Sequence, residues 1–425
     1  GTPSRGVNSI DIVDANTVWV GSYDGTNTSN YITDFSKTIN GGTLWTAGTI
    51  TTGLTGVGLG NISAIDGDTA WASIFHPTQA VATGIWKTTD GGVSWNKQTT
   101  AAFTAASFPD FVYFWNANNG IAVGDPLGGY FEVYTTADGG TTWVRTANTG
   151  NQLQASSSSE YGYTNDFSVV GNTLWFGSTT GRVFKTTDMG LTFTKASVAN
   201  GVTDVQKVSF ADAITGYAFM HTAGNKSYKI ARTLDGGTNW SAIINTTSIA
   251  DSTVLGADIT AVPGTNALIS VGSDVTAKGS SWSGDGGLSW ELMEDTSLAP
   301  QRLSVRFLDA STGWAGTFNI DAFTSGISKF NGMVGIGAAG NSTKNVTAFP
   351  NPAADLLTLN INGLNGKQLL ISVFNVMGEK ISSEKMQTGS PVYFKHIDLS
   401  ALSAGLYFVE VTDGNNKFVN KFIKQ

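Results

Sequence analysis

The sequence predicts an all-β protein in which one four-stranded unit is repeated along most of the chain and a small, separate β-domain follows. Three observations predict this. An eight-residue turn motif recurs at near-constant spacing, short β-rich segments recur upstream of it, and the composition changes near residue 345. Glycine makes up 52 of the 425 residues and only 13% are charged, which is typical of strands joined by many tight turns.

The turn motif is clearest in residues 88–95, which read Thr-Thr-Asp-Gly-Gly-Val-Ser-Trp. Its six copies close on aromatic residues spaced 47 to 50 positions apart, namely Trp45, Trp95, Trp143, Phe193, Trp240 and Trp290. A side-chain oxygen at the third position can accept hydrogen bonds from its own turn, and the glycines supply backbone angles that other residues resist. We therefore expect a structural role for the third-position residues Asn40, Asp90, Asp138, Asp188, Asp235 and Asp285.

A second repeated segment lies upstream of the turn motifs and occurs seven times. Each copy is a short strand-like run, such as 17–21 or 69–73, preceded by an alternating apolar run. Seven four-stranded units predict a seven-bladed β-propeller over residues 1–335, because a closed ring leaves few strand edges exposed. The seventh unit lacks the turn motif, so its fourth strand must come either from Met333–Ile336 or from the N-terminal residues.

The six turn motifs resemble the Asp-box, a repeat with the pattern Ser/Thr-x-Asp-x-Gly-x-Thr/Ser-Trp/Phe. This motif occurs in sialidases, sortilin-type receptors, xyloglucan-degrading enzymes and photosystem-assembly factors. The resemblance implies a β-propeller of that superfamily. It indicates little about function, because those families share the motif and little else.

Residues 336–345 are rich in Gly, Ala, Ser and Asn and predict a linker, and residues 346–425 predict a small β-sandwich. This tail resembles the C-terminal sorting domain of type IX secretion substrates at Pro350, Asn351, Pro352, Gly378, Gly405 and Tyr407. The resemblance implies a secreted protein at the outer-membrane surface of a Gram-negative bacterium. It also implies partners in the type IX translocon and its shuttle proteins.

Charge and cysteine content exclude several classes of function. A formal net charge of −8 provides no basic surface for nucleic acid. No run of about 18 apolar residues is present, so we expect no membrane span. The absence of cysteine excludes disulfides and thiol catalysis. His76, His221 and His396 lack metal-ligand spacing, so we expect no metal and no cofactor.

Catalysis on sugars would need converging arginines or paired carboxylates. A sialidase places three arginines around one carboxylate, whereas only Arg302 and Arg306 can approach the channel mouth here. A glycoside hydrolase needs two carboxylates about 5–9.5 Å apart, and the loop carboxylates that could supply them are Asp24, Asp125, Glu160, Asp274 and Asp321. Loops also contain Asp for turn geometry alone, so we predict no catalytic residue. Asp11, Asp110, Asp166 and Asp258 fall on or near the innermost strands, where a turn or cap role is favoured over cation binding.

We expect ligand binding on the propeller face opposite the turn motifs, where the connections vary in length. The candidate residues on that face are Tyr23, Asp24, His76, Asp125, Tyr130, Tyr161, Tyr163, His221 and Asp321. Aromatic and hydrogen-bonding side chains together suit a sugar, so the favoured function is a non-catalytic binding or adhesion module for a glycan or a surface protein. The alternatives are a glycoside hydrolase using paired loop carboxylates and a structural surface-layer or filament subunit.

Overall fold

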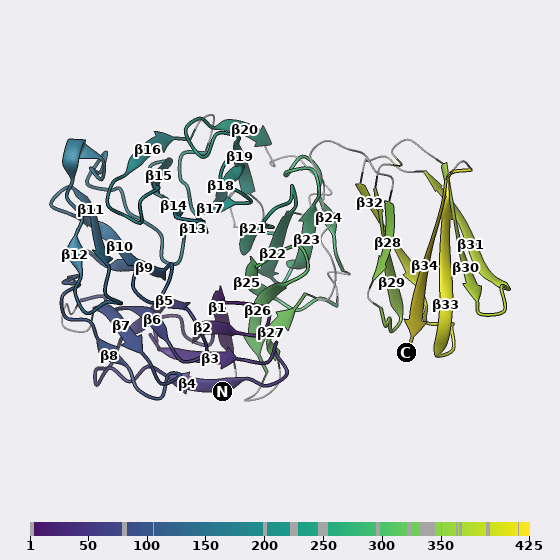
Figure 1. Ribbon diagram of the computed structural model, residues 1–425, viewed down its shortest axis with the longest axis horizontal. Coiled ribbons are helices and arrows are strands. Elements are labelled where there is room, and N and C mark those ends of the chain that lie inside the picture. The colour runs from purple at the N-terminus through teal and green to yellow at the C-terminus, as the bar shows by residue number, and fades with distance from the viewer. Residues whose placement is uncertain are drawn as a thin grey trace. The chain divides into compact units, whose positions relative to one another are not determined.

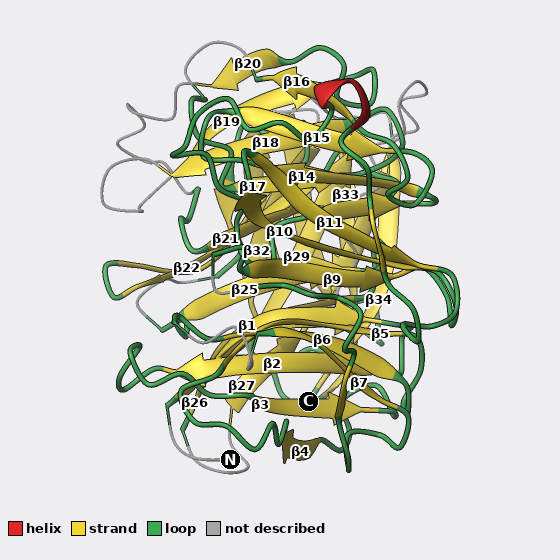
Figure 2. Ribbon diagram, turned by 90° about the vertical axis from the view of Figure 1, so that its left-hand side faces the viewer, coloured by secondary structure: helices red, strands yellow, loops and turns green. Residues whose placement is uncertain are grey.

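The computed structural model describes residues 4–78, 83–104, 106–198, 202–221, 228–244, 254–294, 298–320, 325–330, 345–349, 351–362, 364, 368–387, 392–414 and 416–425. The chain divides into two compact units, Gly1–Phe330 and Asn331–Gln425. Figure 1 shows the first unit as sheets that follow one another around a ring. Strands dominate in Figure 2, and η1 (Thr149–Asn151) is the only helix within the described ranges. None of the described chain forms a helix long and apolar enough to cross a membrane.

The ring consists of antiparallel groups of strands that follow in chain order. The first three are β1 (Arg5–Ile12), β2 (Val18–Asp24), β3 (Asp34–Thr38) and β4 (Thr46–Thr49); β5 (Gly58–Ala64), β6 (Ala70–Phe75), β7 (Gly84–Thr88) and β8 (Asn96–Lys97); and β9 (Pro109–Phe114), β10 (Gly120–Leu127), β11 (Tyr130–Thr136) and β12 (Val144–Arg145). The next three are β13 (Ser168–Val170), β14 (Thr173–Gly177), β15 (Arg182–Thr186) and β16 (Thr194–Ser197); β17 (Lys207–Phe210), β18 (Gly216–His221), β19 (Tyr228–Thr233) and β20 (Ser241–Ile244); and β21 (Asp258–Ala261), β22 (Leu268–Asp274), β23 (Ala277–Ser283) and β24 (Glu291–Leu292). The last is β25 (Arg302–Phe307), β26 (Gly313–Asn319) and β27 (Ser325–Lys329). The prediction of an all-β propeller is confirmed.

The first and last groups of strands join to close the ring. Gly6 of β1 pairs with Phe318 of β26, and the Ser304 hydroxyl donates to the Val7 carbonyl at 2.9 Å. Among the described strands, only β26 pairs with β27. Met333–Ile336, one predicted source of a fourth strand, lies outside the described residues. The predicted linker does too, except Asn345, which begins β28.

Large aromatic side chains join several of the sheets to the next one along the chain. The Trp71 side chain is fully buried, stacks on Phe114 with ring centroids 3.4 Å apart, and donates its indole N–H to the Gly139 carbonyl of the next turn motif. Trp175 makes the matching bond to the Gly236 carbonyl at 3.0 Å. Trp71 and Trp175 therefore bind the neighbouring sheet through both packing and a hydrogen bond.

Each turn motif is held by side chains from its own sequence. In the motif of residues 136–143, the Asp138 carboxylate accepts from the Thr142 amide at 2.8 Å, and the Thr136 hydroxyl accepts from the Gly140 amide at 2.9 Å. Gly139 and Gly140 have φ of 72° and 90°, which L side chains rarely adopt. The Asn40 side chain accepts in the same way from the Leu44 amide at 2.8 Å. Local sequence therefore determines this hairpin geometry.

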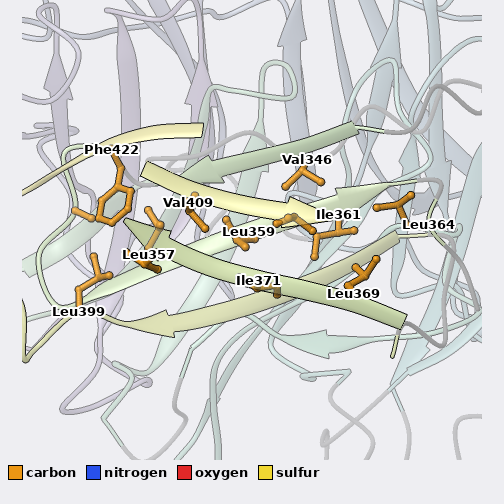
Figure 3. Packing of buried hydrophobic residues seen from close by; sticks show 13 residues of the cluster. Val346, Leu357, Leu359, Ile361, Leu364, Leu369, Ile371, Leu399, Val409 and Phe422 are labelled. Carbon is orange, nitrogen blue, oxygen red and sulfur yellow. The ribbon is translucent and has the colours of Figure 1, made fainter. Parts of the chain in front are cut away.

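The second unit is a sandwich of two sheets. One contains β28 (Asn345–Phe349), β29 (Leu356–Asn362) and β32 (Val392–Asp398); the other contains β30 (Gln368–Asn375), β31 (Lys380–Gln387), β33 (Gly405–Thr412) and β34 (Lys417–Lys424). Figure 3 shows their shared core, in which Leu359 and Ile361 of one sheet pack with Ile371, Val409 and Phe422 of the other. The predicted small C-terminal β-sandwich is confirmed.

Candidate functional site: the loop face and the channel

The turn motifs and the connections between the first and second strands of each group form one end of the propeller. The opposite end, called the loop face here, is formed by the connections after the second strand and those between groups. These include residues 25–33, 76–78, 98–104, 128–129, 146–167 and 178–181. They differ in length and sequence, unlike the turn motifs. Those predicted binding residues that the structure describes lie at this end, and the structure shows which of them come together.

Three aromatic side chains form a row across the loop face. Tyr31 contacts Phe75 edge to face with ring centroids 5.3 Å apart, and Phe75 contacts Phe108 at 4.6 Å. They come from three successive sheets: the β2–β3 connection, the end of β6 and the residue before β9. Tyr31 is 38% exposed, and the other two are partly exposed. None of the three was among the predicted site residues. They occupy three different positions in their repeat units, so no repeated sequence signal marks them.

Tyr161 and Tyr163, both predicted, lie on the long β12–β13 connection. Tyr161 is 48% exposed, and its amide donates to the Thr179 hydroxyl at 2.9 Å. The Tyr163 hydroxyl donates to Asp204 at 2.5 Å, and burial followed by this carboxylate raises the pKa of Tyr163. Tyr161 is therefore available to a ligand, whereas the Tyr163 hydroxyl is already engaged.

Two carboxylates converge on Gly162 of the same connection. Asp125 accepts a hydrogen bond from the Gly162 amide at 3.0 Å. Asp110 of β9 lies so close that a Cβ on Gly162 would be 2.2 Å from its Oδ2. Burial, the Asp125 charge and the Asp166 charge raise the pKa of Asp110 well above its usual range, and burial raises that of Asp125 to about 6. Asp110 is only 2% exposed and lies beneath the surface, whereas Asp125 is partly exposed.

Residues 162–166 extend across the channel mouth. The Asn165 amide donates to the Asp110 carbonyl at 2.9 Å, and the Asn165 side chain donates to the Asn8 carbonyl of β1 at 3.2 Å. The Asp166 carboxylate accepts from the Val208 amide of β17 at 2.9 Å. This short segment therefore contacts innermost strands of three different sheets, and it lies where a ligand over the channel mouth was predicted to bind.

The channel contains a cavity of about 390 Å³ lined by innermost strands, with Asn165 among its lining residues. Asp258 receives Arg306 at 2.7 Å and Lys207 at 3.3 Å, and these two cations favour its ionised form against burial, so that its pKa is lowered. Asp11 accepts from the Ala64 amide at 2.6 Å, and burial raises the pKa of Asp11 to about 7. The innermost acids therefore join neighbouring sheets.

A second cavity, of about 680 Å³, lies between β27 and the first sheet. It is lined by the open side of β27 at Ser325 and Ile327, by Phe35 and Trp45 of the first sheet, and by Arg5. Arg5 forms ion pairs with Asp24 at 3.1 Å and Asp34 at 3.0 Å.

Other predicted loop-face residues make structural contacts with their own neighbours. Asp24 is 6% exposed and pairs with Arg5, and hydrogen bonds led by the Thr26 hydroxyl lower its pKa. Tyr23 packs against Phe318 at 6.1 Å. Within the described residues, no contact joins Tyr23 or Asp24 to Tyr161.

His76 and Tyr130 also contact neighbouring residues. His76 is 8% exposed and its Nδ1 accepts from the Thr78 amide at 3.0 Å. The Arg145 guanidinium lies over the Tyr130 ring at 4.9 Å. His221 ends β18, but its side chain lies outside the described residues, and Asp321 lies outside them entirely. Within the described ranges, no three His, Cys, Asp or Glu side chains are grouped to hold a metal ion.

The sorting-motif residues occupy turns and strand starts of the C-terminal sandwich. The Asn351 side chain donates to the Lys421 carbonyl and accepts from the Ile423 amide, both at 3.0 Å, so it joins the chain before β29 to β34. Gly378 has φ of 80° in the β30–β31 turn. Gly405 begins β33, where the Tyr407 hydroxyl donates to the Ser403 carbonyl at 2.9 Å. Pro352 follows Asn351, and Pro350 lies outside the described residues.

Comparison with known proteins identifies the tail and the fold. Residues 347–425 match the family model "Secretion system C-terminal sorting domain". No curated protein matches the chain. The structure is similar to YCF48 bound to D1 peptide (14% identity, 76% of this chain, 92% of that chain, TM-score 0.53) and to YCF48 from Cyanidioschyzon merolae (14%, 77%, 96%, 0.52).

An ancestral GH74 enzyme is also similar, at 13% identity over 99% of this chain and 62% of that chain, with a TM-score of 0.52. At these identities the likeness establishes the propeller fold alone. The sorting-domain match is more specific. The chain therefore ends in a type IX sorting domain, interacts with that secretion machinery, and is a secreted protein.

Proposed function

We propose that the propeller is a non-catalytic glycan-binding module that works outside the cell after type IX export. The observation that supports this most is the row of Tyr31, Phe75 and Phe108 on the loop face. Sugar rings present apolar C–H faces, which pack on partly exposed aromatic rings, while neighbouring polar groups bond the hydroxyls. Tyr161 provides a further exposed ring on the same face.

The carboxylates favour binding over hydrolysis. Asp24 is paired with Arg5, and Glu160 is paired with Arg182 and also accepts from Ser178. Asp274 accepts from the amide and hydroxyl of Thr276 at 2.7 and 2.6 Å, which fixes its own turn. Three of the five loop carboxylates that could serve a hydrolase are thus committed to structure.

The remaining described carboxylate, Asp125, is the observation that favours a hydrolase. It shares Gly162 with Asp110, and paired carboxylates are what glycoside hydrolysis needs. Asp110, however, is covered by residues 162–166 and reaches no substrate in this arrangement. We therefore place hydrolysis second.

A glycan array probed with the full chain, followed by a hydrolysis assay on every glycan that binds, separates these functions. Binding without product supports the binding module. Product formation that is lost in Asp125→Asn would establish the hydrolase instead. Binding of protein baits with no glycan bound would contradict the choice of ligand. Self-association into ordered assemblies would favour a structural subunit.

The export route leads to further expectations. We propose that the boundaries lie at 1–335, 336–345 and 346–425, that shuttle proteins recognise the tail, and that the protein remains at the outer-membrane surface. Deleting residues 346–425 should abolish secretion and leave a folded propeller, because linked domains usually share modest contacts. Secretion of the truncated chain at the wild-type level would contradict this.

A further inference from the structure

Asp110 is an unusual carboxyl group in this protein. It is 2% exposed, yet its Oδ2 has no hydrogen-bond partner among the described residues. Most buried carboxylates are stabilised by donors or cations. Asp258, for example, is also buried but receives two backbone amides as well as Arg306 and Lys207.

The charged groups that act on Asp110 are both acidic. They are Asp125, which shares Gly162 with it, and Asp166, whose own Oδ2 also lacks a partner among the described residues. Lys207 and Arg306 act on Asp166 and pair with Asp258, whereas no cation is among the groups that shift the pKa of Asp110. Carboxylates buried together without a cation cannot all ionise at low cost.

Gly162, in the segment of residues 162–166, lies in close contact with the Asp110 carboxyl group. Any side chain there would meet the Asp110 carboxyl, since its first carbon would lie 2.2 Å from Oδ2. The same residue donates its amide to Asp125, and Asn165 donates its amide to the Asp110 carbonyl. The covering segment is therefore held at the two acids.

We propose that Asp110 is protonated while residues 162–166 cover the channel mouth, and that loss of this proton releases the segment. Deprotonation adds one buried negative charge, at Asp110, to those of the ionised Asp125 and Asp166. Movement of the segment lets water reach all three carboxylates and relieves that cost. Release also opens the channel mouth beside Phe108, the end of the aromatic row. This inference is independent of which ligand the loop face binds.

The sign of the pH dependence follows from the pKa directions. Because the pKa of Asp110 is raised in the covered state, that state is favoured at low pH and becomes less stable as pH rises through the raised value. Burial also raises the pKa of Asp125 to about 6 and that of Asp166 to about 7, so both act in the same direction. Tyr163, whose pKa is raised above 10.0, stays neutral over this range.

The absence of cysteine permits a site-specific probe. Thr164 is exposed in the middle of the covering segment, so a fluorophore on Thr164→Cys reports the mobility of that segment. We expect its anisotropy to fall as pH rises from about 5 to 9, the range in which raised carboxyl pKa values lie. In Thr164→Cys/Asp110→Asn, which cannot ionise at this site, we expect a much smaller fall in anisotropy, because only Asp125 and Asp166 still titrate in this range.

Two further variants make the test specific. The Asp125→Asn change keeps an oxygen for the Gly162 amide and removes one of the charges that repel ionised Asp110, so the fall in anisotropy should be smaller. The same fluorophore on Val93→Cys, at an 88% exposed turn-motif position, should show no transition. Melting curves at pH 5 confirm that each variant is folded. A constant anisotropy in the labelled Thr164→Cys protein, or an equal transition after Asp110→Asn, would overturn the proposal.

Discussion

The two ends of the propeller are built in different ways. At the turn-motif end, the same hydrogen bonds recur from Asn40 to Asp285, each between a side chain and an amide four residues later. At the loop face, each contact occurs once, as in the Tyr163–Asp204 bond or the Tyr31–Phe75 pair. This difference indicates that the turn-motif end stabilises the fold, whereas the loop face can carry residues that bind a ligand. If the two ends have these separate roles, substitutions at them should change stability and binding by different amounts.

The largest effect is expected where a second-strand aromatic residue meets the next turn motif. Trp71→Ala removes a fully buried ring that stacks on Phe114 and donates to the Gly139 carbonyl. It should lower the free energy of unfolding by about 3–5 kcal/mol, measured by denaturant titration. Val93→Ala, at an exposed site on a turn motif, is the matched control and should change it by less than about 0.5 kcal/mol. If the two variants change the free energy of unfolding equally, the packing of Trp71 does not stabilise the propeller as proposed.

The second-largest loss of stability is expected at a structural ion pair on the loop face. Burial opposes ionisation of Glu160, but bonds from Arg182, Ser178 and Ser156 outweigh it and lower the Glu160 pKa to about 2. Glu160→Gln should cost about 3 kcal/mol of stability at neutral pH, since it leaves Arg182 without its partner.

The pH dependence of the Glu160 effect has a definite sign. A lowered pKa contributes stability above the ordinary value of 4.5, and this contribution is lost as pH falls toward 2. The difference between wild type and Glu160→Gln should therefore shrink over that interval. A difference that stays constant with pH would show that the ion pair is not its source.

A smaller effect is expected within one turn motif. Asp138→Ala removes the acceptor of the Thr142 amide and should cost about 1 kcal/mol. Asp138→Asn keeps that oxygen, as Asn40 does in the first motif, and should be close to wild type in thermal unfolding. If the Asn variant is as unstable as the Ala variant, the hydrogen-bond explanation is wrong.

The smallest effect on stability is expected on the loop face itself. Tyr161→Ala removes a ring that is 48% exposed and leaves the backbone bond to Thr179 in place. Its melting temperature should match wild type within the change that surface substitutions usually cause, about 0.5 kcal/mol in stability. A large loss would show that Tyr161 belongs to the scaffold.

The sequence predicted the fold because its signals are local and repeated. The turn motifs contain their own hydrogen-bond donors and acceptors, and the spacing of Trp45 through Trp290 revealed the sheet period. The tail was predicted by short motifs at Asn351–Pro352 and Gly405–Tyr407, which lie within the residues 347–425 that the family model matches.

The site was less predictable because it depends on contacts between distant segments. Tyr31, Phe75 and Phe108 are separated by tens of residues and meet only when successive sheets pack side by side. The bond from Asn165 to the Asn8 carbonyl joins residues 157 apart, and no local pattern indicates it. Asp24 looked available as a loop residue, but its pairing with Arg5 required the folded ring.

The most direct test of the central claim measures glycan affinity at both ends of the propeller. Using the tightest ligand from the array, isothermal titration should show that Tyr31→Ala weakens binding by about tenfold, or 1.4 kcal/mol. Val93→Ala, at the turn-motif end, should bind as wild type does. A Tyr31→Ala protein with wild-type affinity, together with weakened binding in Val93→Ala, would contradict the assignment of function to the loop face.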